Sequence, residues 1–317
     1  MWIQEFSCST FKKDENKGKM KIFDCFMFYD EEMILDFRLN YLNNYVDKFV
    51  VVESSYTHSG KKRELIFDIK KYSKFKDKIS YTVLDEEPGS LFEVDEKDSF
   101  DKKNSKYILN ALKRENLQRN YITKGLKDTS PEDMIIISDV DEIPNLEENN
   151  LNNLKNKISL FNQKFFYYKF NLKLQSFDWY GSKACKKANL ISPQWLRSIK
   201  SKKYPFWRLD TLFSKTKYQD IFFIKNGGWH FSNMKTAEAI EKKMSTYLHH
   251  REYDLNPLGT KKIKEIMKNK KAIYNLRADK KTDKFDNTQN LVVSEISELP
   301  TYIQNNLEKY KDWIELK

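Results

Sequence analysis

Glycine, proline and cysteine are scarce in this chain, and it has no long hydrophobic run. There are only 8 glycines and 7 prolines, so a flexible linker between domains is not expected. The three cysteines, Cys8, Cys25 and Cys185, show neither the spacing of a metal site nor the even number of a disulfide framework. At least one of them lacks a disulfide partner within the chain, which fits a reducing compartment.

Apolar segments long enough for targeting or membrane insertion are also missing. No run approaches the ~20 residues that a membrane-spanning helix needs, and the N-terminal residues lack the apolar core of a secretory signal. We interpret residues 1–19 as a poorly ordered leader, with Met20 as an alternative start. These absences predict a cytoplasmic protein that acts in solution or at the inner membrane surface.

Aromatic side chains and positive charge, in contrast, are abundant. Of the 317 residues, 15% are aromatic and 39% are hydrophobic, and the net charge is +11. A chain of this composition can fill a sizeable core, in one large domain or two. The charge favours anionic partners, which include sugar nucleotides, nucleic acids and anionic membranes. Most lysines are mixed with acidic residues and fit a solvated surface, but the dense basic stretch 261–284 is a candidate contact for phosphates or a membrane.

Apolar runs alternate with segments of helical period in the first half of the chain. The pattern predicts strands at 21–29, 49–52, 79–84 and 134–139, and helices at 31–45 and 104–125. Strands that alternate with helices form right-handed crossovers. We therefore expect an α/β fold with a mainly parallel central sheet flanked by helices.

The second half is less regular. It predicts an antiparallel strand at 165–174, a hairpin of 212–213 with 221–224, and helices at 235–250, 261–276 and 297–315. We therefore expect three parts: the leader 1–19, a main domain at 20–260, and a helical C-terminal extension, 261–317, packed on the same domain.

The sharpest motif is an apolar strand that ends in a cluster of carboxylates, Met134 to Pro144. Side chains alternate along a strand, so Asp139 and Asp141 point the same way at its end. Two carboxylates this close repel each other unless a cation lies between them. Because ligands bind at the carboxyl ends of strands in α/β sheets, the motif predicts a divalent cation, Mn²⁺ or Mg²⁺, that carries phosphate. The alternative is a strand followed by an acidic, solvated turn.

A second motif, Asn226 to Ser232, places His230 directly after Gly227, Gly228 and Trp229. Two glycines allow close backbone approach, and a neutral imidazole can bind a transition metal. His230 is thus a natural third ligand beside the two aspartates. The alternative is a turn before the next helix, with His230 buried in the core.

Four stretches together resemble glycosyltransferase family 17. They are residues 46–54, 133–144, 181–185 and 228–232, in this order, and the likeness extends over roughly residues 20–255. The resemblance implies a GT-A-type, Rossmann-like fold, a nucleotide-sugar donor, a divalent cation and inversion at the anomeric carbon.

The resemblance also implies roles for particular residues. Asp139, Asp141 and His230 would form the metal and diphosphate site. The donor-binding candidates around them are Glu53 for the nucleoside, and Gln118 and Arg119 on the helix before the metal strand, where Arg119 would reach a phosphate or the donor sugar. Apart from the resemblance, Trp229 is a candidate for stacking on a sugar ring or the base, and the alternative is that it packs in the core.

The catalytic base stays open between two carboxylates. Glu142 is adjacent to the site, although its position on the strand points it to the other face. Asp210 lies in the region expected to line the acceptor side. Either would take the proton from the attacking hydroxyl.

The most specific expectation is transfer of N-acetylglucosamine from its UDP-sugar to a hydroxyl of a glycan or glycolipid. One alternative is a metal-dependent nuclease or phosphoryl-transfer enzyme, but a two-metal site needs more separated acids than the single cluster here. The other is a non-catalytic glycan-binding module with Ca²⁺ on Asp139 and Asp141, but their spacing does not match an EF-hand loop. No nucleic-acid partner is expected, and the sequence does not define the oligomeric state.

Overall fold

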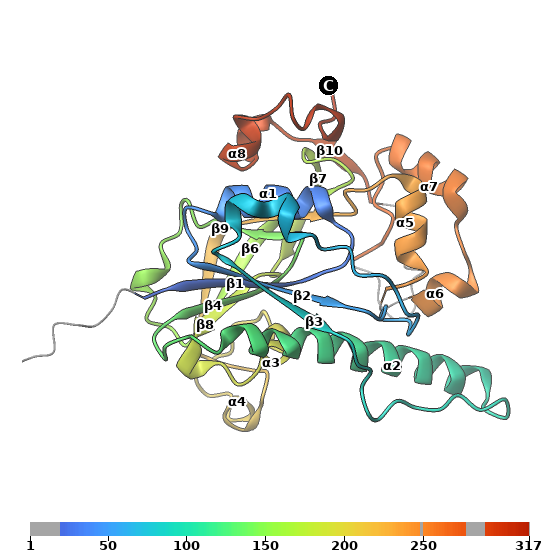
Figure 1. Ribbon diagram of the computed structural model, residues 1–317, viewed down its shortest axis with the longest axis horizontal. Coiled ribbons are helices and arrows are strands. Elements are labelled where there is room, and N and C mark those ends of the chain that lie inside the picture. Colours follow the sequence, from blue (N-terminus) through green and yellow to red (C-terminus); the bar gives the residue numbers. More distant parts are fainter. Residues whose placement is uncertain (1–19, 248–249, 277–288, 317) are drawn as a thin grey trace, which may run out of the picture.

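The computed structural model describes residues 20–247, 250–276 and 289–316 (Figure 1). The strands are β1 (Ile22–Phe28), β2 (Lys48–Ser54), β3 (Ile79–Leu84), β4 (Met134–Asp139), β5 (Glu142–Pro144), β6 (Ile158–Tyr167), β7 (Leu172–Trp179), β8 (Lys183–Lys186), β9 (Ile221–Ser232) and β10 (Leu291–Val293). The α-helices are α1 (Glu32–Leu42), α2 (Phe100–Tyr121), α3 (Pro193–Ser198), α4 (Asp210–Phe213), α5 (Ala237–Met244), α6 (His250–Leu255), α7 (Gly259–Lys268) and α8 (Thr301–Gln304).

One half of the sheet is parallel, in the order β3-β2-β1-β4. Strands β1, β2 and β4 in this half are mostly apolar and buried, since helices cover both faces. Figure 1 shows α1 on one face and α2 with α3 on the other. Val50 and Val52 pack on the face that also holds Ile135 and Ile137, whereas Val51 packs on the opposite one. The α/β alternation predicted from the sequence is confirmed for this half.

The other half is mostly antiparallel, so the sheet as a whole is mixed. Beyond β4 the order continues β8-β6-β7-β10 with antiparallel pairing throughout. Strand β9 then adds a parallel pairing with β6 and an antiparallel one with the short β5. The reversal follows from tight connections, such as the turn after Tyr167 in which Tyr168 takes a φ of 61°, because a parallel crossover needs a much longer segment.

Two predictions for this half were wrong. The strand expected at 165–174 is interrupted, since β6 ends at Tyr167 and β7 begins at Leu172. The hairpin expected between 212–213 and 221–224 does not form, because 212–213 belong to α4 and 221–224 begin the long strand β9. Strand β9 obtains its partners from β6 and β5, both distant in sequence, and local apolar pattern cannot reveal such pairing.

The C-terminal part also differs from its prediction. The helices expected at 235–250 and 261–276 are present as the shorter α5 and α7. Residues 297–315 form no single helix, only α8 and two 3₁₀ turns, at Ile296–Glu298 and Lys311–Trp313. Strand β10 joins the sheet beside β7, so this part is not purely helical. The leader 1–19 and residues 277–284 of the basic stretch lie outside the described residues.

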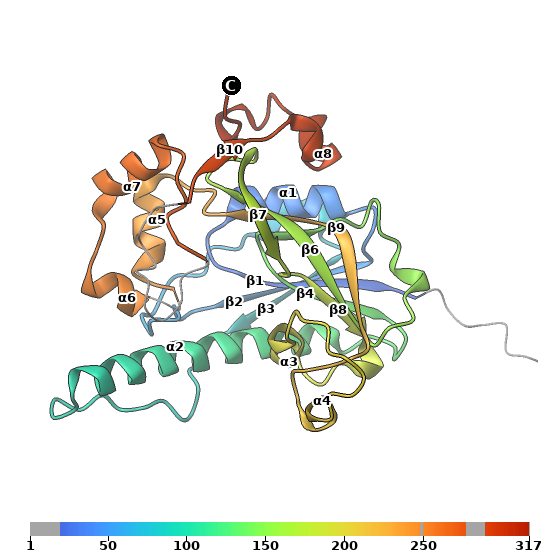
Figure 2. The same ribbon diagram turned by 180° about the vertical axis from the view of Figure 1, so that it is seen from behind.

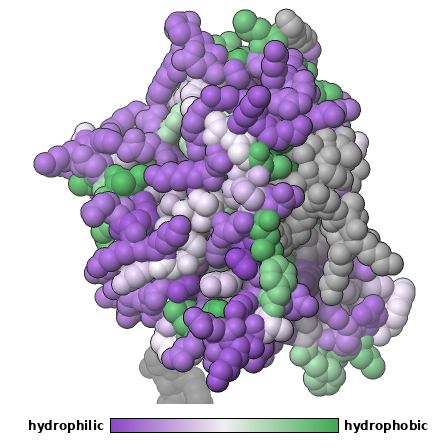
Figure 3. All heavy atoms as spheres, turned by 90° about the vertical axis from the view of Figure 1, so that its right-hand side faces the viewer, coloured by the Kyte–Doolittle hydropathy of each residue, from purple (hydrophilic) through white to green (hydrophobic). Residues whose placement is uncertain are grey.

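The parallel strands all end at the same edge of the sheet, where α5, α6 and α7 stand beside them (Figures 1 and 2). Figure 3 shows the molecule from that side, where most of the described residues at the surface are hydrophilic. Within the described residues, no helix is both long enough and apolar enough to cross a bilayer.

Ligands of α/β sheets bind at the edge where the parallel strands end. A ligand site is therefore expected at this edge of the sheet.

Candidate active site

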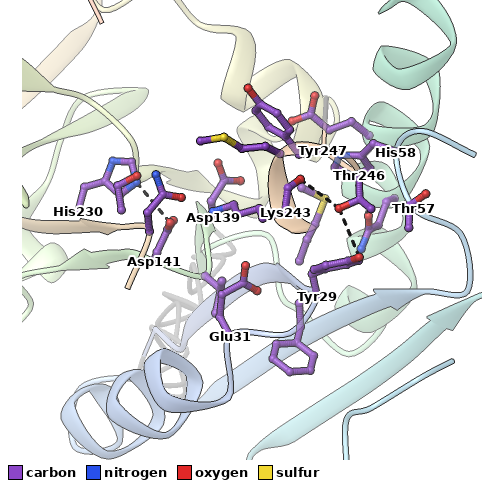
Figure 4. Close-up of a pocket in the computed structure, with 18 of the residues that line it drawn as sticks. Tyr29, Glu31, Thr57, His58, Asp139, Asp141, His230, Lys243, Thr246 and Tyr247 are labelled. Carbon is purple, nitrogen blue, oxygen red and sulfur yellow. Dashed lines mark hydrogen bonds and ion pairs between the residues drawn. The ribbon is translucent and has the colours of Figure 1, made fainter. Parts of the chain in front are cut away.

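A cavity of about 570 Å³ opens at this edge of the sheet. Its wall is built by the ends of β1, β2, β4 and β9 together with α2, α3 and α5, and it includes Asp139, Asp141, His230, Gln118 and Arg119. Figure 4 shows His230 and Asp141 toward one side of the cavity and His58, Thr57 and Thr246 toward the other. The structure thus brings together five of the residues predicted from the sequence.

The Asp139–Glu142 turn is held from below by a buried arginine. Arg38, on α1, is fully buried and donates from Nη1 to the backbone carbonyls of Asp139, Val140 and Glu142 at 3.1, 3.1 and 2.7 Å. Its other nitrogens form a bidentate ion pair with the buried Asp24, at 2.6 and 2.8 Å. A guanidinium satisfied on all sides fixes the backbone that carries the two aspartates.

Asp139 projects into the cavity between two arginines. Its carboxylate accepts from Arg119 Nη2 at 3.1 Å and from Arg197 Nη2 at 2.9 Å. Burial alone would raise the pKa of Asp139, but the two guanidinium groups outweigh it and hold that pKa well below its usual range. Asp139 is therefore ionised at neutral pH.

Asp141, in the turn between β4 and β5, faces His230 on β9. Its Oδ2 lies 3.5 Å from His230 Nε2 (Figure 4). Burial opposes the charge on Asp141, but attraction to His230 lowers its pKa overall. His230 packs against the rings of Phe165 and Trp179, with centroid distances of 4.3 and 5.0 Å, and its Nδ1 is buried with no hydrogen-bond partner.

These side chains fit a metal ion only if the ion takes most of its ligands elsewhere. Among the described residues, no three His, Cys, Asp or Glu side chains are close enough to hold a metal ion by themselves. Asp141 and His230 are near neighbours, whereas Asp139 is engaged by arginines. Such a partial set suits a cation like Mg²⁺, which commonly uses one or two carboxylates with substrate phosphates and water.

Glu142 lies beneath the cavity and does not line it. Its side chain is fully buried and accepts from Asp139 N, Trp179 Nε1 and both terminal nitrogens of Arg197, at 2.8 to 3.0 Å. Every lone pair that could take a proton from an acceptor is thus already engaged. Glu142 connects the Asp139–Glu142 turn to Arg197 and orients both.

The Gly181–Cys185 stretch supports the turn that carries the two aspartates. A Cβ at Gly181 would lie 2.3 Å from the Glu142 carboxyl group, so only glycine leaves room for that side chain. Ser182 donates to the Glu142 carbonyl. Lys183 donates to the carbonyls of Arg197 and Ile199, and burial, reinforced by the nearby Arg197, lowers the Lys183 pKa to about 7.

The two glycines before His230 serve the sheet and not a ligand. Both lie within β9, where a Cβ on Gly227 would meet the backbone of Phe161 at 2.8 Å and one on Gly228 would meet the Ile143 carbonyl at 2.0 Å. The turn considered from the sequence is absent. The glycines let β9 approach β5 and β6, which places His230 opposite Glu142 in the register.

Glu53 and Trp229 were proposed as donor contacts, but neither lines the cavity. Glu53 is fully buried and accepts from Arg63, Tyr81 OH and the backbone N–H groups of Ile66 and Phe67. It orders the loop after β2. The indole of Trp229 lies in the core on the other side of β9, where it donates to the Glu298 carbonyl.

Gln118 and Asp210 occupy very different places. Gln118 lines the cavity, where it bonds the imidazole of His58 at 3.2 Å and donates to the Val52 carbonyl. Asp210 lies on α4, outside the cavity wall, in ion pairs with Arg208 and Lys217. Hydrogen bonds from those two cations lower the pKa of Asp210.

Sequence reasoning missed Arg38, Arg197 and Lys243. Arg38 lies within an amphipathic helical pattern, and Arg197 follows the short apolar segment Trp195-Leu196 with no motif around it. Lys243 reaches the cavity from α5. Only Arg38 left a signal in the sequence, because it is an arginine among the apolar residues of a helix. A charge in such a position is rarely buried without a partner, so it indicates a buried acidic partner.

Comparison with curated proteins finds no match. Comparison with protein families matches residues 3–314 to a single description, Glycosyltransferase family 17. The match covers nearly the whole chain, including every strand of the sheet and every residue of the cavity wall. The chain belongs to glycosyltransferase family 17 and is a glycosyltransferase.

Proposed function

We propose that this enzyme transfers a sugar from a UDP-sugar, with UDP-N-acetylglucosamine as the best candidate, to a hydroxyl of a glycan or glycolipid, with inversion on a GT-A-type fold. The carrying observation is the composition of the cavity wall at the carboxyl ends of the parallel strands. Four acidic side chains and four Arg or Lys side chains line it. A donor diphosphate adds negative charge to this balanced wall, and a divalent cation would offset that charge.

Arg119 and Arg197 are the residues that would contact the diphosphate. The Nε of Arg119 is buried without a hydrogen-bond partner, which is costly unless a ligand accepts from it. Arg197 is the partly buried neighbour that shares Asp139 with it. Two guanidinium groups side by side favour a phosphate, because their fork geometry matches its oxygens.

The divalent cation, Mn²⁺ or Mg²⁺, would be held by Asp141 and His230, with Asp139 beside them. When bound, it would stabilise the charge on the leaving diphosphate. The rings of Phe165 and Trp179 pack against the imidazole of His230 and keep the ring in place, whereas Nδ1 has no hydrogen-bond partner. His230 therefore presents Nε2 toward Asp141 in the free enzyme.

Glu31 is the candidate base that the cavity favours over Glu142 and Asp210. Of the four acidic side chains in the wall, Asp139, Asp141 and Glu115 face Arg or His partners within 3.5 Å. Glu31 also has a cationic partner, Lys235 at 3.6 Å, but Lys235 contacts Asp30 more closely and is shared with it. Figure 4 shows the Glu31 carboxylate directed toward the cavity, where it can accept the proton of an attacking hydroxyl.

A thermal-shift screen tests the donor. UDP, GDP and CMP are compared with and without Mn²⁺ or Mg²⁺, because a ligand that binds only the folded state raises the melting temperature. We expect a cation-dependent shift with UDP that is lost in Asp141→Asn and kept in Asp312→Asn, an exposed control outside the cavity. A shift with another nucleotide, or no cation dependence, would overturn the donor or the metal assignment respectively.

Turnover of UDP-N-acetylglucosamine then shows whether Glu31 or Asp210 is the catalytic base. Glu31→Gln should lower kcat by about a hundredfold or more while keeping the UDP-induced shift, since base catalysis contributes that much. Asp210→Asn should keep kcat near wild type. If Asp210→Asn loses turnover and Glu31→Gln does not, the assignment to Glu31 is wrong.

A further inference from the structure

We propose that residues 200–217 form a docking surface for an anionic lipid membrane, apart from the sugar-transfer cavity. This segment, called the α4 loop below, carries five large apolar side chains that are 65% to 89% exposed. They are Phe206, Trp207, Leu209, Leu212 and Phe213. Figures 1 and 2 show α4 beyond α3, farther from the sheet in both views.

An apolar cluster of this kind is unusual on a soluble surface. Single exposed apolar residues are ordinary, but contiguous ones mark a surface that binds something. Here five of them fall within eight positions. Phe206 and Trp207 contact each other edge to face, with centroids 5.0 Å apart, and the other three exposed side chains follow within the next six residues of the same segment.

The loop is built by polar contacts that leave its apolar side chains free for a ligand. Gln219 Nε2 donates to the carbonyls of Pro205 and Phe206 and to the Thr211 hydroxyl, at 3.3, 3.3 and 2.9 Å. Asp210 joins Arg208 to Lys217. The conformation is thus supported without burying the aromatic rings, so their exposure is not a sign of a poorly packed core.

The charge around the cluster selects the occupant. Lys200, Lys202, Lys203 and Lys215 flank the apolar tip and are exposed. Asp210, the only acidic residue of the α4 loop, is already neutralised by its two ion pairs. Aromatic and aliphatic side chains next to lysines are what an anionic membrane interface attracts, since the rings enter the headgroup region while the ammonium groups contact phosphates.

A second copy of the chain fits this surface less well. Self-association through the α4 loop would bring the two lysine clusters together, and the chain already carries a net charge of +11. Like charges placed opposite each other oppose such a contact. A bilayer with acidic headgroups satisfies both the apolar and the cationic parts of the surface.

Co-sedimentation of the full chain with vesicles tests the proposal. Vesicles of phosphatidylcholine alone are compared with vesicles that also contain phosphatidylglycerol. We expect binding to the anionic vesicles only, weakened by added salt. Both Phe206→Ser/Trp207→Ser/Phe213→Ser and Lys200→Glu/Lys202→Glu/Lys203→Glu should weaken it by about tenfold or more.

A matched control removes exposed apolar side chains elsewhere. Ile191→Ser/Phe100→Ser changes two residues that are 71% and 60% exposed but lie outside the α4 loop, and it should bind vesicles like wild type. Far-ultraviolet circular dichroism and the UDP-induced shift should be unchanged in all three variants, which separates lost docking from misfolding.

Tryptophan emission gives a second measurement. It should shift to the blue on anionic vesicles and lose this shift in Trp207→Phe, which keeps a ring for binding. Three results would overturn the proposal: no vesicle binding by wild type, equal binding to neutral and anionic vesicles, or a dimer in gel filtration that the triple serine variant abolishes.

Discussion

At the scale of single residues, the most consequential side chain is one that never reaches the cavity. Arg38 joins α1 to the turn that carries both aspartates, through three carbonyl bonds and the pair with Asp24. Replacing it leaves Asp24 as an unpaired buried charge. We expect Arg38→Met to lose about 3–5 kcal/mol of unfolding free energy, the usual result of breaking a buried ion pair.

Urea denaturation measures this loss, and an exposed pair provides its control. Lys71 and Glu32 are ion-paired at 2.7 Å but are 53% and 47% exposed, so Lys71→Met should change stability by less than about 1 kcal/mol. Equal effects from Arg38→Met and Lys71→Met would contradict the role of Arg38.

The sequence was informative about site residues where they share a strand end or belong to a distinctive motif. Asp139 and Asp141 share a strand end, and His230 could be placed beside them because β9 carries a distinctive motif. Arg197 meets Asp139 only through the packing of α3 on β8 and β4. Glu53 resembled a ligand contact by position, but its partners come from a loop that folds back over it, which no local pattern specifies.

At the scale of elements, the approach of β9 to β5 depends on one glycine. Gly228 has a φ of +131°, and a Cβ there would lie 2.0 Å from the Ile143 carbonyl oxygen. Backbone cannot move away as a flexible side chain can. We expect Gly228→Ala to destabilise the protein by about 4 kcal/mol or more and to displace His230.

Gly259→Ala is the matched control for that variant. Gly259 also has a positive φ, +76°, but no atom lies within 4 Å of a Cβ built on it. Only the conformational cost remains, about 1 kcal/mol. Chemical denaturation gives the free energy of unfolding of both variants. A similar loss in the two would show that the close contact at Gly228 contributes little beyond backbone strain.

Element prediction succeeded where periodicity and pairing are both local. Strands β1, β2 and β4 are mostly apolar runs, and helices α1 and α2 between the parallel strands are long enough to be recognised. Residues 297–315 have helical spacing, but Pro300 and the pair Asn305-Asn306 divide the segment. Its apolar side chains pack into the main core from short turns instead.

At the scale of the whole molecule, many carboxylates are held ionised by cations. Hydrogen bonds from Lys264 lower the pKa of Glu238 to about 2, and those from Lys102 and Lys106 lower that of Asp98. A folded-state pKa below the unfolded value, about 4, means that the folded state binds fewer protons. This stabilisation is complete above about pH 4 and is lost as pH falls through the folded-state values.

Acid unfolding should therefore proceed in two steps. Burial lowers the pKa of His58 below its ordinary value, so stability first falls as pH drops through about 6.5, where the unfolded chain takes up a proton that folded His58 does not. The carboxylates cause the second fall, below about pH 4, while the net charge rises above +11 and adds repulsion. The melting temperature, measured from pH 8 to pH 3, should fall twice, near pH 6.5 and again below about pH 4. His58→Gln should remove the fall near pH 6.5 and keep the one below about pH 4. A melting temperature that stays constant down to pH 3 would mean that these pairs persist in the unfolded chain.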